Sequence, residues 1–369
     1  MHRVGLHYSL SPQGGPALLK NPLFDLLQAV HDEGSIKRAA ERLALSYRYV
    51  WGELKSWETT LGRTLVTWEK GRPAQLTEFG AKLMWAERQA QARLLPQITA
   101  LRADLDRVFA VAFDESAHIL TFFASHDAAL SALSDHARDQ RLHLDIRFTG
   151  SVDAIRALNE GRCTMAGFHA RHDPAVGSLA QKVYKPLLRP GLHKLIGFTR
   201  RTQGLIVAAG NPLRLQSLGD LALKRARLSN RARGTGTRVL LEDLLTEQGI
   251  RSHDLLGYEN EEPSHAAVAE AVASGTADAG IGIEASARAR GLDFVPLVEE
   301  HYYLACLKSS LEQPATQSLL TLLASDAWQQ KLRTLPGYSP DASGEILSMS
   351  KVLPWWRFRE RKHATAESA

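Results

Sequence analysis

Residues 35–77 constrain the fold more than any other part of this 369-residue chain. Apolar side chains recur at helical spacing from Ile36 to Leu43, and a second helical stretch follows from Tyr47 to Thr60. Ser35 and Ser46 precede these two stretches, where a hydroxyl can cap the first turn of a helix. Two short helices joined by a tight turn form the arrangement that lays the second helix in the major groove of DNA.

A basic hairpin is predicted after the second helix. Two short apolar stretches, 65–68 and 74–77, frame a turn at 69–73 that is rich in glycine, proline and basic charge. From residue 35 to 75 there are eight Lys or Arg and four Glu, an excess that suits DNA. A solvated helical pair that serves protein contacts is the alternative. The predicted DNA contacts are Ser46, Tyr47, Arg48, Tyr49, Lys55, Lys70 and Arg72.

This segment resembles the winged helix-turn-helix of molybdate-responsive ModE-type regulators and, more distantly, that of LysR-type regulators. The resemblance rests on the run AAERLALSYRYVWGELKSWETTLGRTLV and on GRPAQLTEFG, which closes the wing. It covers about 23 to 90, where helix, turn, helix and wing occur in this order. The resemblance implies double-stranded operator DNA as a partner.

The composition favours a multidomain globular protein. A chain of this length holds two or three compact units, and 44% hydrophobic and 23% charged residues are ordinary for a soluble protein. No run of eighteen apolar residues occurs and the N-terminus lacks the apolar core of a secretory signal, so we expect a cytoplasmic protein with no membrane partner. Cys163 and Cys306 form no CxxC pair, which argues against a disulfide framework or a cysteine zinc site.

A long amphipathic helix is predicted over 79–108, between the two units. Pro96 lies in the middle of this pattern and is expected to kink or divide the helix. We expect the helix to pair with its counterpart in a homodimer or higher homo-oligomer, although packing on the second domain is an alternative. The predicted units are 1–22, a lead-in; 23–78, the winged helix-turn-helix; 79–112, the linker and dimerisation helix; 113–345, the effector domain; and 346–369, a basic aromatic tail.

Strands and helices alternate after Ala117, beginning with an apolar strand at 118–124. This order is typical of a parallel sheet covered by helices on both faces. Ligands of such folds bind beyond the carboxyl ends of the strands. Ser125, Ser151 and His169 are the polar residues expected there.

A glycine-rich loop over 229–238 precedes a helical stretch. Gly234 and Gly236 allow a close backbone approach, and the free N–H groups of a helix start attract an anion. A purely structural glycine turn is the alternative. The polar residues that could join an anion here are Arg231, Arg233, Thr235, Thr237 and Arg238.

Residues about 117 to 310 resemble the periplasmic-binding-protein-like domain that is fused to ModE-type DNA-binding heads. The motifs are RTQGLIV at 201–207, GNP at 210–212, GTGTR at 234–238, SHAAVA at 264–269 and ASGTADAG at 273–280. The resemblance implies two lobes that close over a small anion without turnover, with no catalytic residue, no metal and no cofactor. By matching positions, the predicted ligand contacts are Ser125, His126, Ser151, His169, Arg201, Gln203, Thr235, Gly236, Thr237 and Arg238.

These residues do not decide which kind of anion the domain binds. Hydroxyls and backbone amides suit a tetrahedral oxyanion such as molybdate or tungstate, whereas arginine or histidine suits a small carboxylate such as formate. Glu261, Glu284 and His265 would be acid–base candidates in an enzyme, and an oxyanion-storage protein is a further alternative. The expected fold is multidomain: an all-α winged helix-turn-helix N-terminal domain and a two-lobed α/β periplasmic-binding-protein-like C-terminal domain. Activation or repression and the target genes are not encoded in these patterns.

Overall fold

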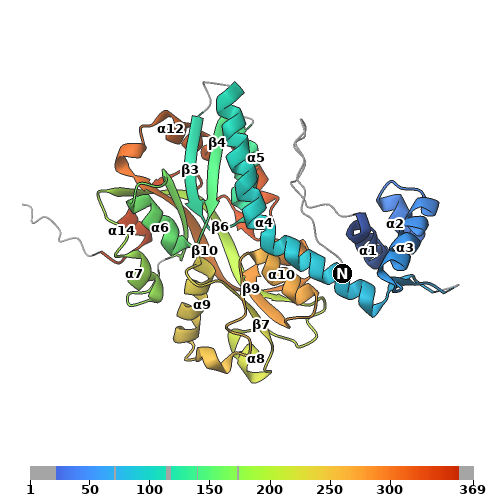
Figure 1. Ribbon diagram of the computed structural model, residues 1–369. Coiled ribbons are helices and arrows are strands. Elements are labelled where there is room, and N and C mark those ends of the chain that lie inside the picture. The colour runs from blue at the N-terminus through green and yellow to red at the C-terminus, as the bar shows by residue number, and fades with distance from the viewer. Residues whose placement is uncertain (1–21, 70–71, 114–117, 139, 173, 357–369) are drawn as a thin grey trace, which may run out of the picture. The chain divides into compact units, whose positions relative to one another are not determined.

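A computed structural model describes residues 22–69, 72–113, 118–138, 140–172 and 174–356 (Figure 1). The chain divides into two compact units, residues 1–99 and 100–369. The boundary between the two units falls within helix α4 (Glu78–Phe113).

The first unit contains three short helices and a two-stranded hairpin. Ser35 accepts a hydrogen bond from the backbone N–H of Arg38, and Ser46 accepts one from that of Tyr49, so both predicted caps are confirmed. The two strands are antiparallel, as a wing requires. The elements are α1 (Pro22–Glu33), α2 (Ile36–Arg42), α3 (Tyr47–Leu61), β1 (Val66–Thr67) and β2 (Gln75–Leu76).

The core of this unit lies under α3. Val50 and Leu54 are the buried residues of this helix, whereas Trp51 and Trp57 are only partly buried at the margin. The buried face of α3 therefore runs through Val50 and Leu54, and the two indoles lie at its edge. Gly80 lets α4 cross the hairpin closely, since a Cβ there would strike the backbone of Leu65.

The helix α4 (Glu78–Phe113) is continuous for 36 residues. Pro96 lies inside it and does not divide it, whereas the alternative that Pro96 kinks the helix stays a prediction. Proline removes one backbone hydrogen bond, and the complete turns on both sides keep the helix together.

The second unit is built on one curled, mixed sheet with strand order β4-β3-β5-β10-β6-β9-β7-β8, and β11 and β12 pair with β6. Strands are parallel within β4-β3-β5 and within β9-β7-β8, whereas β6 and β10 are antiparallel to their neighbours. The predicted parallel sheet thus exists only inside each half. The strands are β3 (His118–Ala124), β4 (Leu142–Phe148), β5 (Met165–Arg171), β6 (His193–Val207), β7 (Leu228–Arg231), β8 (Glu261–Glu262), β9 (Ala279–Ile283), β10 (Asp293–Leu307), β11 (Tyr338–Ser339) and β12 (Ile346–Leu347).

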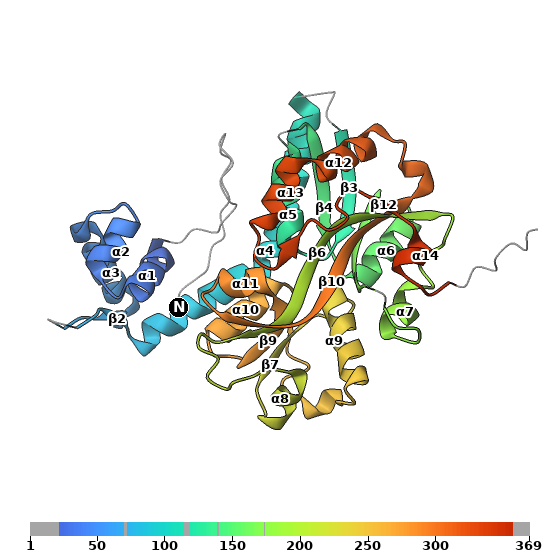
Figure 2. The same ribbon diagram turned by 180° about the vertical axis from the view of Figure 1, so that it is seen from behind.

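Two lobes share the long strands β6 and β10, each of 15 residues, which run from one lobe into the other (Figures 1 and 2). Helices cover both faces of the sheet in each lobe, and each face has its own apolar cluster. This confirms the predicted two-lobed α/β domain. The first lobe carries α5 (Ala128–Arg138), α6 (Ser151–Asn159), α7 (Leu179–Tyr184), α12 (Pro314–Ala324), α13 (Asp326–Arg333) and α14 (Met349–Val352), and the second carries α8 (Leu218–Leu223), α9 (Gly236–Glu247), α10 (His265–Ala273) and α11 (Glu284–Arg288).

The chain beyond α14 packs on the first lobe. Trp355 is buried against Tyr184, with ring centroids 6.5 Å apart, and its indole N–H donates to the carbonyl of Pro174 at 3.2 Å. The described part of the predicted tail therefore docks on its own domain. Across the described ranges, no helix is both long and apolar enough to span a membrane.

Candidate ligand site and DNA-binding face

Residues near the strand ends of the two lobes lie close together, and glycines allow this close packing. A Cβ on Gly150 would lie 2.6 Å from the carbonyl oxygen of Gly234, and a Cβ on Gly236 would lie 2.9 Å from Cβ of His169 and 3.1 Å from Oγ of Ser151. Only glycine permits this approach. The structure thereby brings together three of the predicted ligand residues, Ser151, His169 and Gly236.

Arg201 lies at the centre of this region on β6 and is 2% exposed. Its guanidinium pairs with Asp127 and with Glu300, the latter at 2.7 Å, and Tyr338 donates a further hydrogen bond to Asp127 at 2.8 Å. Burial alone would lower the pKa of Arg201, but Glu300 and Asp127 outweigh it and raise that pKa. The charge of Arg201 is therefore already compensated within the protein.

Gln203 connects β6 to the start of α9. Its side-chain amide donates to the hydroxyl of Thr237 and to the carboxylate of Glu300, both at 2.8 Å. The predicted residues Gln203 and Thr237 are thus in direct contact, with Thr237 in the first turn of α9.

Arg231, the last residue of β7, is the second buried guanidinium and is 1% exposed. One of its Nη atoms donates to the carbonyl oxygen of Glu262 at 2.9 Å, but its Nε has no hydrogen-bond partner in the described part of the chain. Burial first, and then the charge of Arg201, lower the pKa of Arg231 to about 9, with Glu262 opposing the shift. The sequence named Arg231 as one of the loop residues that could join an anion but left it out of the contacts implied by the resemblance; strand alternation places it on the same face as Ser229.

Several buried polar atoms around Arg231 have no hydrogen-bond partner among the described residues. Each such atom costs about 1–3 kcal/mol when it stays unsatisfied, so folded proteins contain few of them. Their concentration at one place indicates a site for a polar ligand. The atoms are Oγ of Ser125, Ser151 and Ser229, both ring nitrogens of His169, Nδ1 of His265, Oε1 of Gln203 and Oη of Tyr302.

Three histidines near the two arginines are held neutral. Burial, followed by the charge of Arg231, lowers the pKa of His126 to about 4. Burial also lowers the pKa of His169 and of His265 well below the ordinary value, again with both arginines contributing. His169 additionally stacks on Tyr302, with ring centroids 3.9 Å apart. At neutral pH the positive charge of the site therefore comes from the arginines and not from the histidines.

Two predicted ligand residues are engaged elsewhere. The hydroxyl of Thr235 donates to the carbonyl of Ala232 at 2.7 Å. Its oxygen also accepts the backbone N–H of Arg238 and thereby caps α9. Arg238 turns back along the helix, pairs with Glu242 at 2.9 Å and stacks on the ring of Tyr258. Neither Thr235 nor Arg238 belongs to the set of buried polar atoms without a hydrogen-bond partner in the described ranges. Arg231 is the arginine of this loop that does.

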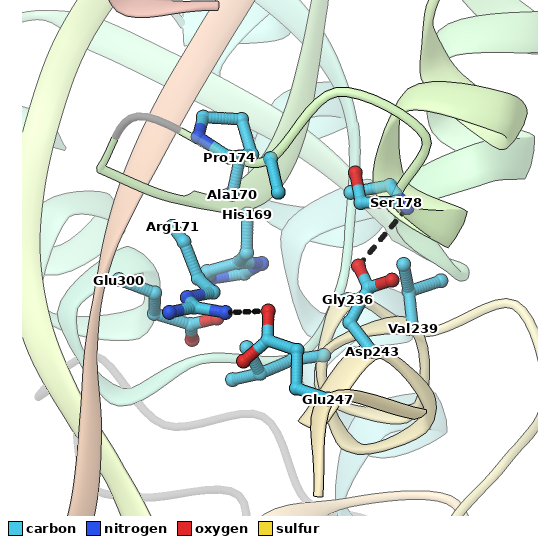
Figure 3. A pocket seen from close by; sticks show the side chains of 13 residues that line it. His169, Ala170, Arg171, Pro174, Ser178, Gly236, Val239, Asp243, Glu247 and Glu300 are labelled. Atoms are coloured by element: carbon cyan, nitrogen blue, oxygen red, sulfur yellow. Dashed lines mark hydrogen bonds and ion pairs between the residues drawn. The ribbon is translucent and has the colours of Figure 1, made fainter. Parts of the chain in front are cut away.

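A small pocket lies on the outer side of His169, between β5 and α9 (Figure 3). Its volume is about 10 Å³, which is room for about one water. Arg171 from the first lobe pairs there with Glu247 from the second. The carboxylate of Asp243 on α9 also accepts the backbone N–H groups of Leu179 and Ala180, at 2.6 and 3.1 Å, at the start of α7. Side chains of one lobe thus hold the other lobe in contact.

The predicted DNA-binding residues lie mostly on one exposed face of α3. Arg48 and Gly52 are exposed there, and Tyr47 and Tyr49 are 47% and 50% exposed. The remaining predicted residues are constrained by neighbours or not described: Ser46 caps α3, Lys55 pairs with Glu58, Arg72 pairs with Glu69, and Lys70 lies outside the described residues.

A winged helix-turn-helix followed by a two-lobed α/β domain with a cluster of unpartnered buried polar atoms is an arrangement that fits a DNA-binding regulator. Residues 23–81 match the bacterial regulatory helix-turn-helix protein, lysR family, and residues 133–324 match the PBP superfamily domain. The chain belongs to the PBP superfamily and carries a lysR-family DNA-binding head. The matched regulatory helix-turn-helix makes the chain a DNA-binding transcriptional regulator.

Relatives align with parts of the chain. The uncharacterized protein YvgK of Bacillus subtilis (strain 168) is 30% identical over 225 residues, which are 61% of this chain and 72% of YvgK. An uncharacterized protein of Clostridium pasteurianum, from the 5′ region of a ferredoxin 2Fe-2S gene, is 33% identical over 111 residues, 30% of this chain and 98% of its own. A solved structure of the Corynebacterium glutamicum OxyR C206 mutant shows 17% identity and a TM-score of 0.43, with 85% of this chain and 93% of that chain covered.

Proposed function

We propose that this regulator senses a small anion of the molybdate or tungstate type at the buried polar cluster around Arg231. The observation that carries the proposal is Arg231, a buried guanidinium whose Nε has no partner among the described residues. A buried cation with unused hydrogen-bonding capacity is stabilised by an anion that reaches it.

The neighbours of Arg231 favour an oxyanion. Arg201 is compensated by two carboxylates, so an incoming anion is left with the charge of Arg231. The hydroxyls of Ser125, Ser151 and Ser229 each supply one O–H donor, and these neutral donors satisfy oxygens without adding charge. This is the donor set expected for the several oxygens of a tetrahedral oxyanion.

A small carboxylate such as formate is the second candidate. Its support is also Arg231, because a guanidinium binds a carboxylate through charge-assisted bonds. One Nη of Arg231 is already bound to the carbonyl of Glu262, and its unpartnered Nε lies on the edge that a carboxylate would contact. The preference for the oxyanion therefore rests on the serine hydroxyls.

Thermal unfolding of the full-length protein against molybdate, tungstate, sulfate, phosphate and formate tests the effector class. A ligand that binds only the folded state contributes about 2.7 kcal/mol at one hundred times its Kd. For a unit of this size the expected rise in Tm is roughly 5–10 °C. A selective rise with molybdate or tungstate supports the proposal. A rise with formate alone replaces the oxyanion by a carboxylate, and no rise with any of the five contradicts the anion site.

We further propose that α3 enters the major groove of an operator and that the hairpin touches the adjacent backbone. Arg48 and Lys55 extend from the exposed face of α3, where Gly52 leaves open space for close approach. Tyr47 and Tyr49 supply hydroxyls for phosphate oxygens, and Arg72 supplies charge from the wing. Selection of duplexes from a random-sequence pool by the full-length protein tests this; recovery of no common sequence would contradict it.

Dimerisation through α4 is proposed from an exposed apolar stripe. Leu101, Leu105, Val108 and Phe109 are 55%, 39%, 50% and 38% exposed and follow the spacing i, i+4, i+7, i+8 of one helix face. A second copy of the chain would cover this stripe and pair two DNA-binding heads with two half-sites. Sedimentation equilibrium should show a dimer that Leu105→Asp converts to monomer; a monomeric wild-type protein contradicts this.

A further inference from the structure

An exposed row of aromatic rings links α3 to the wing. Tyr47 stacks on Trp51 with ring centroids 6.4 Å apart, and Trp51 meets Trp68 edge to face at 6.4 Å. Trp68 directly follows β1 and is 58% exposed. The row therefore begins at the start of the helix proposed to enter the groove and ends on the hairpin.

The exposure of Trp68 is unusual for its position. Leu65 and Val66, just before it, are buried in the core of the head, whereas Thr67 and Trp68 are exposed. A tryptophan offers a large apolar surface, and a chain that leaves it in water beside a binding helix keeps it available for a partner. The core of the head is complete without it, because Leu65, Val50 and Met84 are already enclosed.

The charges around the row point to a polyanion as the partner. The ammonium of Lys55 lies 5.0 Å from the ring centroid of Trp51, and Arg48 is exposed one turn before it. Two nearby carboxylates are paired: Glu58 accepts the N–H groups of Leu65 and Val66 and pairs with Lys55, and Glu69, next to Trp68, pairs with Arg72. Burial alone would raise the pKa of Glu58, but these hydrogen bonds outweigh it and lower that pKa. A flat apolar ring beside basic side chains can pack on the sugars of DNA while the basic groups contact its phosphates.

We propose that Trp68 packs against the deoxyribose backbone of the operator and fixes the wing on DNA by a nonionic contact. The inference rests on the proposed entry of α3 into the major groove. Aromatic contacts of this kind add affinity without releasing counterions, whereas each Lys or Arg that meets a phosphate adds about one unit to the salt slope. Trp68 and Arg48 are therefore distinguishable by how their loss changes salt dependence.

The experiment measures binding of full-length protein to a fluorescent duplex taken from the selected pool, over a series of salt concentrations. Trp68→Ala should lower affinity roughly tenfold and leave the salt slope unchanged. Trp68→Phe, which keeps a flat ring, should recover most of the affinity. Arg48→Ala should lower both the affinity and the slope, the latter by about one. Leu223→Ala, at a leucine that is 81% exposed in the second unit, serves as the matched surface control.

Several results would overturn the inference. Full affinity of Trp68→Ala would overturn it, and so would a lowered salt slope for that variant. Unchanged DNA affinity with an altered sedimentation coefficient would assign Trp68 to a protein contact instead. If Trp68→Ala unfolds, Trp68→Phe decides: DNA should quench wild-type tryptophan emission more than that of Trp68→Phe, and equal quenching contradicts the contact. Failure of the wild-type protein to bind any duplex would remove the proposed groove contact of α3 as well.

Discussion

Replacing Arg231 with methionine should strongly weaken effector binding while leaving the protein folded. Truncating one partner of a buried, hydrogen-bonded charge pair costs about 2–5 kcal/mol, so affinity should fall by roughly thirty-fold to several thousand-fold. Methionine has a similar length and no charge, and replacing a desolvated guanidinium by an apolar side chain is often neutral or stabilising. The Tm without ligand should therefore stay the same or rise, and the ligand-dependent rise should shrink.

The matched control for this change is Arg233→Met. Arg233 lies two residues further along, with its side chain 71% exposed and paired with Glu259 at 2.7 Å. Isothermal titration with the anion that raises the wild-type Tm should give wild-type affinity for this control. Wild-type affinity in Arg231→Met would place the anion away from β7 and refute the proposed site.

Replacing Arg201 with methionine should, in contrast, lower the free energy of unfolding of the protein. The change leaves the buried carboxylates of Asp127 and Glu300, which are 1% exposed each, without their shared cation. Removing one partner from a buried ion pair costs about 3–5 kcal/mol. Urea unfolding at pH 7 should show this loss as a lower midpoint with an unchanged slope.

The carboxylates provide the control for Arg201. Adding Asp127→Asn and Glu300→Gln to the Arg201→Met variant removes both uncompensated charges and should recover part of the lost stability. An equal urea midpoint for Arg201→Met and wild type at pH 7 would show that this ion-pair network contributes nothing.

Local patterns explain why the DNA-binding head was predictable. The 3.6-residue period of its helices, the caps Ser35 and Ser46 and the turn residues of the wing are all read within a few positions of one another. The antiparallel crossing of β6 and β10 was not predicted, because it depends on pairs such as Arg201 with Glu300, almost a hundred residues apart. Hydrophobic runs reveal a buried strand but not its direction in the sheet.

The ligand site, too, was predictable where it depends on local patterns and not where it depends on distant residues. Strand ends predicted that Ser125, Ser151 and His169 gather at one edge, and the structure brings Ser151 and His169 to the glycine loop. The sequence could not decide which arginine of the loop turns inward. Arg238 is also buried, but it pairs with the carboxylate of Glu242 four residues later, whereas Arg231 belongs to a strand that the glycine pattern concealed.

The central place of β10 also sets the order in which the chain can fold during synthesis. The core of the DNA-binding head closes once Met84 is available, but both lobes need β10, which ends at Leu307 and lies between β5 and β6. At about 5–20 residues per second, the ribosome takes roughly 10 to 45 s to make the intervening chain. A nascent chain therefore carries a finished DNA-binding head well before it has a sensor, and a product truncated before β10 would keep the head without any means to regulate it.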